Sequence, residues 1–188
     1  MIMKITVNSA IIIYSDKIYL ELLLKELDKT NLLEVIKKNH SSSYINSLYS
    51  EQSNKINYEY SKCEISMKYF RNQSIDLLSY NFIKLYYVIK IKETQKIIGS
   101  IEISINDLNA SIGLFIDESY SNKGFGSASV KCILNFLKNN SNIKTVIWEC
   151  YKYNTNSLKI AKNCGFKYSH DKQDDTNRII SSFFLELN

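Results

Sequence analysis

The sequence lacks proline altogether, which excludes turns built on a cis-proline bond. It has four cysteines and two histidines in 188 residues, and no two cysteines are spaced C-x-x-C. A zinc site needs several such ligands at close spacing, so we expect no metal. The cysteines are expected to be reduced thiols, mostly buried; they are Cys63, Cys132, Cys150 and Cys164.

Long hydrophobic runs are also absent. The run from Ala10 to Tyr14 is far shorter than the roughly 20 residues of a membrane-spanning helix. It also lacks the flanking residues of a signal peptide. We therefore expect a cytoplasmic protein that does not enter a membrane.

Basic residues are spread along the chain rather than clustered, although the net charge is +5 and the isoelectric point about 8.8. Binding to nucleic acid would need a basic stripe or a known reader motif, and neither is present. No nucleic-acid partner is expected. The positive charge indicates either an ordinary solvated surface or a modest attraction to an anionic cofactor.

The remaining composition is that of an ordinary soluble globular protein, with 45% hydrophobic and 23% charged residues. The length suits one compact domain with a proper core. Because no internal repeat or linker is visible, we expect a single domain over residues 1–188.

Hydrophobic spacing predicts the elements of the N-terminal part. They are a strand from Met3 to Tyr14, a helix from Asp16 with Ile18, Leu22 and Leu23 or Leu27 on one face, a short helix from Asn31 to Lys38, a loop from Asn39 to Asn57 with one short helix around Ile45 to Tyr49, and a longer helix from Tyr58 to Tyr80.

Alternating and helical periods predict the rest. The expected elements are strands at Leu85–Lys92, Ile97–Ile105 and Ser111–Asp117, a helix at Phe125–Asn139, a strand at Ile143–Tyr151, a helix at Thr155–Asn163, and a final hairpin of Phe166–Ser169 and Arg178–Leu187 across the polar Asp171–Asn177 loop. The order predicts an α+β fold with a mixed sheet and helices on its faces.

The segment from Asn122 to Ser127 joins a strand to a helix through two glycines, and this arrangement favours an anion site. A dinucleotide loop would require a third glycine after Gly124 and Gly126, and a Walker loop would require Gly-Lys-Ser/Thr. Neither pattern is present. A plain helix start remains the alternative.

This loop resembles the x-x-G-x-G/A loop of the GNAT N-acetyltransferases, which holds the pyrophosphate of acetyl-coenzyme A. Further on, Asn154, Ser157, Ala161, Lys162 and the Gly165-Phe166 pair resemble the N-x-x-S…A-x-K-x-G-F signature of the branch that includes the ribosomal-protein N-terminal acetyltransferases. The resemblance extends more weakly from about Lys84 to the C-terminus.

The resemblance implies a GNAT fold, with a mostly antiparallel sheet flanked by helices, in a monomer or homodimer. It also implies an acetyl-coenzyme A-dependent enzyme that acetylates a primary amine, on a protein N-terminus or a small molecule. Transfer would be direct, in a ternary complex. The rival hypothesis is a GNAT-fold protein that binds an acyl-coenzyme A without turnover.

The resemblance assigns the cofactor to two segments. The pantetheine arm would lie along the strand Leu114, Phe115 and Ile116, unless that strand is fully paired. The pyrophosphate would lie on Asn122, Lys123, Gly124, Phe125, Gly126 and Ser127, with Asn154 nearby as a ligand or simply a helix cap. The family's usual Arg or Gln is Ser121 here, which removes one side-chain donor.

The catalytic positions differ from those of many relatives. The tyrosine that many relatives use as an acid is Ala161 here, so the resemblance assigns Ser157 as proton donor to the thiolate, against a purely structural serine. The base glutamate of some relatives is also missing. Glu102 and Glu149, on flanking strands, are the candidate bases. Tyr151 and Tyr153 would line the acceptor cleft.

Overall fold

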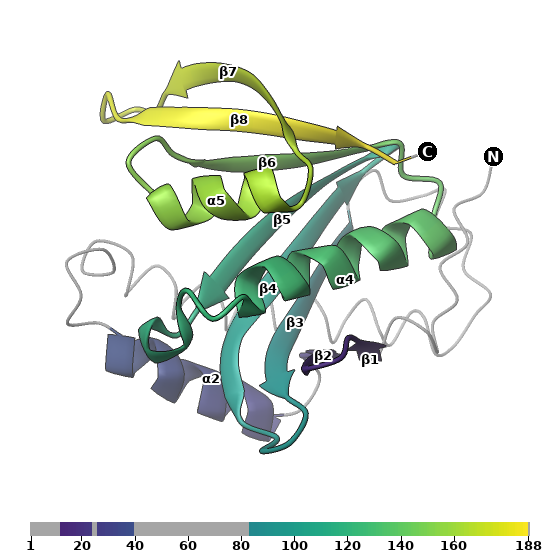
Figure 1. Cartoon of the computed structure of the whole chain (residues 1–188), viewed down its shortest axis with the longest axis vertical. Helices are drawn as coiled ribbons and strands as arrows, with labels where there is room; N and C mark the ends of the chain where they lie inside the picture. Colours follow the sequence, from purple (N-terminus) through teal and green to yellow (C-terminus); the bar gives the residue numbers. More distant parts are fainter. Residues whose placement is uncertain (1–11, 24–25, 40–82, 188) are drawn as a thin grey trace.

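An eight-stranded sheet forms the centre of the computed structural model, which describes residues 12–23, 26–39 and 83–187 (Figure 1). Its strands are β1 (Ile12–Tyr14), β2 (Ile18–Leu22), β3 (Ile83–Ile91), β4 (Ile97–Asn106), β5 (Asn109–Ile116), β6 (Thr145–Tyr151), β7 (Lys167–Gln173) and β8 (Ile179–Glu186). The helices described are α2 (Glu26–Lys38), α4 (Phe125–Asn140) and α5 (Thr155–Asn163), with a 3-10 turn η3 (Glu118–Tyr120).

The strands lie in the order β1-β2-β3-β4-β5-β6-β8-β7. Every neighbouring pair is antiparallel except β5 and β6, which are parallel. A parallel pair needs a crossover connection, and α4 supplies it. The expectation of an α+β fold with a mixed, mostly antiparallel sheet is confirmed.

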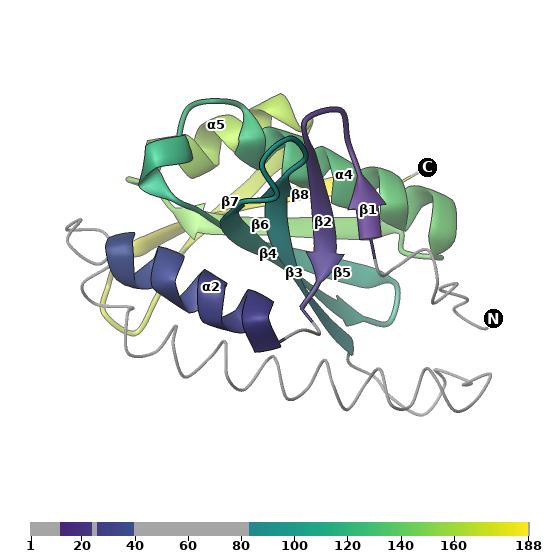
Figure 2. The same ribbon diagram turned by 90° about the horizontal axis from the view of Figure 1, so that it is seen from below.

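The helices cover the two faces of the sheet (Figure 2). On one face, α4 buries Val130, Ile133 and Leu137, and α5 buries Ala161, all in the larger apolar core with Trp148. On the other face, α2 packs Leu32 and Ile36 in a smaller core. Phe115 of β5 packs against this second core, so successive residues of β5 face opposite helices.

The predicted helix beginning at Asp16 is wrong. Residues Ile18–Leu22 form β2, which pairs with β3 from Ile18↔Ile91 to Leu22↔Tyr87. All five residues of β2 are buried. The segment reads I-Y-L-E-L, and Ile18, Leu20 and Leu22 lie together in the larger core, as alternate residues of a strand do. Ile18 and Leu22 are also one helical turn apart, so their spacing fits a helix as well, and pairing with β3 decides between the two.

Most other boundaries agree with the expectation within a few residues. The helix expected at Asn31–Lys38 begins earlier, at Glu26, and β7 extends into the segment expected to be a loop. The strand expected from Met3 is described only as Ile12–Tyr14. The predictions for Ile45–Tyr49 and Tyr58–Tyr80 lie outside the described residues.

Candidate active site

A gap between β5 and β6 is the central feature of the site. These two fully described strands pair only from Asn109↔Thr145 to Ser111↔Ile147, and no pair follows toward their C-terminal ends. Their ribbons diverge accordingly (Figure 1). β5 stays paired with β4 as far as Ile116↔Gly99. Main-chain groups of Leu114 to Ile116 that point toward β6 are therefore available to a ligand.

The loop between β5 and α4 presents a row of main-chain N–H groups. Asn122 and Gly124 have positive φ angles of 60° and 84°. No acceptor within the described residues binds the N–H groups of Asn122 to Ser127, whereas Ala128 donates to the Gly124 carbonyl at 3.0 Å. Such N–H groups, at the positive end of a helix, form a site for an anion.

The two glycines of this loop have different surroundings. A Cβ atom added to Gly124 would meet nothing within 4 Å, so the space beside it is open. Gly126 is buried, and a Cβ there would lie 2.8 Å from Cδ1 of Ile160 and 3.3 Å from Cδ2 of Leu114. Gly126 thus allows α4 to pack closely against α5 and β5, a role that the motif did not indicate.

Hydrogen bonds hold the start of this loop. The buried Asp117 carboxylate accepts bonds from the Ser119 N–H at 2.9 Å and the Ser119 hydroxyl at 2.6 Å. Lys38 of α2 lies 3.6 Å from the same carboxylate. Burial opposes ionisation of Asp117, but these bonds and the Lys38 charge lower its pKa. The sequence analysis missed Asp117, which is the N-cap of η3.

Lys123 does not extend toward the row of N–H groups. Its Nζ atom donates to the Ser119 carbonyl at 2.8 Å and lies 5.3 Å from the centre of the Tyr120 ring. The positive charge is therefore held beside η3.

The start of α5 lies on the same face as α4. Asn154 caps α5, and its Oδ1 accepts the Ser157 N–H at 3.1 Å. The half-buried Ser157 hydroxyl accepts the Trp148 indole N–H at 3.1 Å. Burial raises the pKa of the nearby Cys150 thiol, so this thiol is neutral at pH 7. No sequence pattern indicated this bond between Trp148 and Ser157.

Glu102 lies on the opposite face, beside the gap. It is half-buried on β4 and pairs with Tyr86 of β3 and Gly113 of β5. A Cβ on Gly113 would lie 2.8 Å from Cγ and 3.2 Å from Oε1 of Glu102. The absence of a side chain on Gly113 therefore lets the carboxylate lie across β5, toward the place where β6 diverges.

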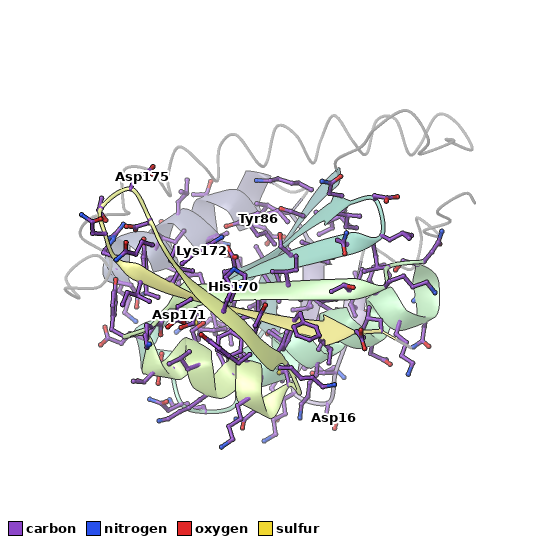
Figure 3. All side chains as sticks on the ribbon, turned by 90° about the horizontal axis from the view of Figure 1, so that it is seen from above. Asp16, Tyr86, His170, Asp171, Lys172 and Asp175 are labelled. Atoms are coloured by element: carbon purple, nitrogen blue, oxygen red, sulfur yellow. The ribbon has the colours of Figure 1, made fainter. Side chains whose placement is uncertain are left out.

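Glu149 is a surface residue of β6. Its Oε1 lies 2.7 Å from Nζ of Lys172, which projects from β7 and is labelled in Figure 3. Both side chains are substantially exposed, at 40% for Glu149 and 46% for Lys172. Solvent screens such a pair, and it holds the carboxylate at the surface.

An aromatic stack continues this face at the end of β6. The rings of Tyr151 and Tyr153 stack with centres 5.2 Å apart and planes at 5°. The Arg178 guanidinium lies 4.5 Å from the Tyr151 ring centre. Asp174 holds this arrangement, because it binds Arg178 at 2.8 Å and accepts the Tyr151 hydroxyl at 3.2 Å. Burial and the neighbouring Asp174 raise the pKa of Tyr151.

Gly99 of β4 is a further residue that the sequence analysis missed. A Cβ there would lie 2.1 Å from the Phe115 carbonyl oxygen. The strands can approach this closely only because residue 99 is a glycine. An isolated glycine within a strand is the signal that could have indicated it.

The described residues contain neither a candidate metal site nor a candidate membrane-spanning helix. No group of three His, Cys, Asp or Glu side chains is placed to hold a metal ion among residues 12–23, 26–39 and 83–187. Over the same residues, no helix has the length and apolarity that crossing a bilayer requires.

Comparison with known proteins identifies the family. The family model described as the acetyltransferase (GNAT) domain matches residues 25–167. The chain belongs to this family of GNAT acetyltransferases. Within the family, the motif from Asn154 to Phe166 resembles that of the ribosomal-protein N-terminal acetyltransferases. A search of curated proteins finds no match.

Solved structures show the same fold at low sequence identity. RimL, a ribosomal L7/L12 alpha-N-protein acetyltransferase in complex with coenzyme A, is 14% identical with a TM-score of 0.71, covering 94% of this chain and 98% of that one. The microcin C7 self-immunity acetyltransferase MccE, in complex with acetyl-CoA and AMP, is 22% identical with a TM-score of 0.68, covering 92% and 93%. An acetyltransferase of the GNAT family from Bacillus anthracis is 14% identical with a TM-score of 0.68, covering 93% of this chain and 98% of that one.

The residues at the loop fit coenzyme A. The N–H groups of Asn122 to Ser127, which bind no acceptor among the described residues, suit a pyrophosphate, and the open space at Gly124 leaves room for it. The half of β5 that does not pair with β6 suits an extended arm that carries amide groups.

Proposed function

We propose that this protein is an acetyl-coenzyme A-dependent N-acetyltransferase that transfers the acetyl group directly to a primary amine. The observation that carries the proposal is the gap between β5 and β6, with the starts of α4 and α5 on one face and Glu102 on the other. A gap through the sheet lets two substrates meet from opposite faces.

The coenzyme would be held on the face of α4 and α5. The N–H groups of Asn122 to Ser127 would bind its pyrophosphate, and the main chain of Leu114 to Ile116 would bind its arm. A β5 N–H directed at the acetyl carbonyl would stabilise the oxyanion that forms during attack, a contribution of about 3 kcal/mol where measured elsewhere.

Proton transfers would involve groups on both faces. Ser157, beside the positive end of α5, would donate a proton to the departing thiolate. Glu102 would remove a proton from the amine, directly or through water. We assign the base role to Glu102 ahead of Glu149, because Glu102 lies half-buried across Gly113 beside the gap, whereas Glu149 lies at the surface. Burial raises the pKa of the Cys132, Cys150 and Cys164 thiols, so none of these three is proposed as a nucleophile, and transfer is proposed to be direct.

The acceptor would approach past Tyr151 and Tyr153. RimL acts on a ribosomal protein, and MccE binds AMP. A peptide N-terminus is supported by the N-x-x-S motif of the RimL-like branch. The exposed face of the Tyr153 ring would suit a planar group as well.

The test is release of coenzyme A thiol from acetyl-CoA in the presence of a panel of amines and of peptides that begin with Ser or Ala. We expect turnover with at least one of them and a roughly 10²–10⁴-fold lower kcat for Glu102→Gln. Glu149→Gln should lower kcat by less than about tenfold. Glu118→Gln, on the exposed η3, is the control and should leave kcat unchanged. A protein that binds coenzyme A but turns over no acceptor would be a non-catalytic acyl-CoA-binding protein.

A further inference from the structure

Ser157 differs from an ordinary helical serine. Ser157 lies in the first turn of α5, whereas a serine further along a helix can donate its hydroxyl proton to a carbonyl one turn earlier. Ser129 of α4 does so, because its hydroxyl bonds to the Phe125 carbonyl at 2.9 Å. In the described structure Ser157 makes no such bond. Its hydroxyl instead accepts a bond, from the indole of Trp148 at 3.1 Å.

The direction of this bond is unambiguous. An indole N–H can only donate, so the Ser157 oxygen is the acceptor. A hydroxyl group has two acceptor positions and one proton, and the indole occupies one of the acceptor positions. The Ser157 proton is thus free to point elsewhere. Its other near neighbour, the neutral Cys150 thiol, is a weak acceptor.

Trp148 is well placed to hold the hydroxyl still. It is only 3% exposed, and its ring contacts the buried Phe166 ring with centres 6.0 Å apart. It lies on β6 next to the gap, in the part of the strand that no longer pairs with β5. The indole N–H therefore comes from a rigid part of the sheet, while Ser157 comes from the first turn of α5.

We propose that Trp148 is a positioning residue that presents the Ser157 hydroxyl as a proton donor to the thiolate leaving from the gap. The inference rests on the proposed function, since it requires Ser157 to be the acid. The competing explanation is the reverse: Ser157 only satisfies the buried indole N–H, and its loss would lower stability without affecting the chemical step.

The experiment replaces Trp148 with 3-benzothienylalanine, which keeps the shape of the ring but exchanges the N–H for sulfur. Trp148→Phe is the second variant, and both are combined with Ser157→Ala. Ser129→Ala is the matched control, because it removes a helical serine hydroxyl of the ordinary kind. For each protein, kcat, KM and coenzyme A affinity are measured with the amine found in the screen, and the melting temperature is recorded.

We expect Ser157→Ala to lower kcat roughly 10²–10⁴-fold. The sulfur analogue should lower kcat about tenfold, the factor equivalent to one hydrogen bond of about 1.4 kcal/mol. Coenzyme A affinity should stay within about twofold, since it depends on the loop and β5. In the Ser157→Ala background the analogue should cause no further loss of kcat, because residues acting as one unit are not additive.

The kcat values of the variants distinguish failure of the inference from failure of the proposed function. If Ser157→Ala lowers kcat strongly and the sulfur analogue does not lower it, Trp148 does not position the serine, while the proposed acid survives. If the two losses multiply, Trp148 acts by another route and the inference is again overturned. If Ser157→Ala lowers kcat only two- or threefold, the proposed acid itself is wrong, and the inference fails with it.

A spectroscopic measurement tests the link without turnover. The sequence has one tryptophan, so the indole N–H gives a single resonance in a ¹⁵N-labelled protein. We expect coenzyme A to shift this resonance in the unmodified protein and to shift it much less in Ser157→Ala. Equal shifts in the two proteins would mean that the thiol does not communicate with Trp148 through Ser157.

Discussion

Replacing Gly124 with valine separates the role of the loop in ligand binding from its role in the fold. Gly124 has a φ of +84°, and a Cβ there would meet no atom of the protein within 4 Å. The substitution therefore costs only backbone strain, of about 1–3 kcal/mol. For a chain of this size that corresponds to a fall in melting temperature of roughly 2–12 °C.

The new side chain would occupy the open space where the proposal places the pyrophosphate. Loss of two charge-assisted hydrogen bonds, at about 1.5–3 kcal/mol each, would weaken coenzyme A binding by at least about 100-fold. Calorimetric titration measures this loss. Gly165→Val is the matched control, since Gly165 has a φ of +85° and a Cβ there would have a nearest neighbour at 3.9 Å. It follows the last turn of α5 and should lower the melting temperature by a similar amount without loss of affinity.

Two results would refute this reasoning. A folded Gly124→Val protein with unchanged affinity would show that the loop does not hold the pyrophosphate. An equal loss of affinity in Gly165→Val would show that backbone strain alone, rather than a blocked site, explains the effect.

Three further predictions concern the scaffold of the site. Lys90→Met should lower the free energy of unfolding in denaturant by about 3–5 kcal/mol. The Nζ atom of Lys90 lies 2.8 Å from Oε2 of Glu21 and 2.7 Å from Oδ1 of Asp28, and all three residues are buried. A decrease under about 1 kcal/mol would contradict this. Gly99→Ala should weaken coenzyme A binding, because the added Cβ would lie 2.1 Å from the Phe115 carbonyl oxygen and would move the second half of β5. Unchanged coenzyme A affinity would contradict this prediction. Above about pH 4, Asp117→Asn should have a lower free energy of unfolding than the unmodified protein, and this difference should shrink as the pH falls further, because the folded pKa of Asp117 lies below its unfolded value. If the two proteins differ by the same free energy of unfolding from about pH 7 to about pH 3, the assignment is wrong.

Features that depend on neighbouring residues could be predicted from the sequence. The helix α5 has the predicted bounds, because Asn154 caps its start and Gly165, with φ +85°, follows its end. The start of α4 at Phe125 was also predicted, from the two glycines before it. These motifs, with one strand between them, also indicated the family that the comparison shows.

Other features depend on residues far apart in the chain, and the sequence could not indicate them. Residues Ile18–Leu22 form a strand because β3 pairs with them, and their own spacing also fitted a helix. The gap in the sheet is a property of how β5 and β6 diverge, and no side chain in either strand encodes it.

The candidate site also combines features that are set locally with contacts between distant residues. The sequence determined by itself a strand, a glycine loop and a helix start, since each is set by local φ angles and local hydrogen bonds. Only the tertiary structure decided that Glu102 lies across Gly113 on one face while the Trp148 indole donates to Ser157 on the other. Both contacts join residues of different elements, and such contacts exist only once the sheet has formed and its helices have packed on it.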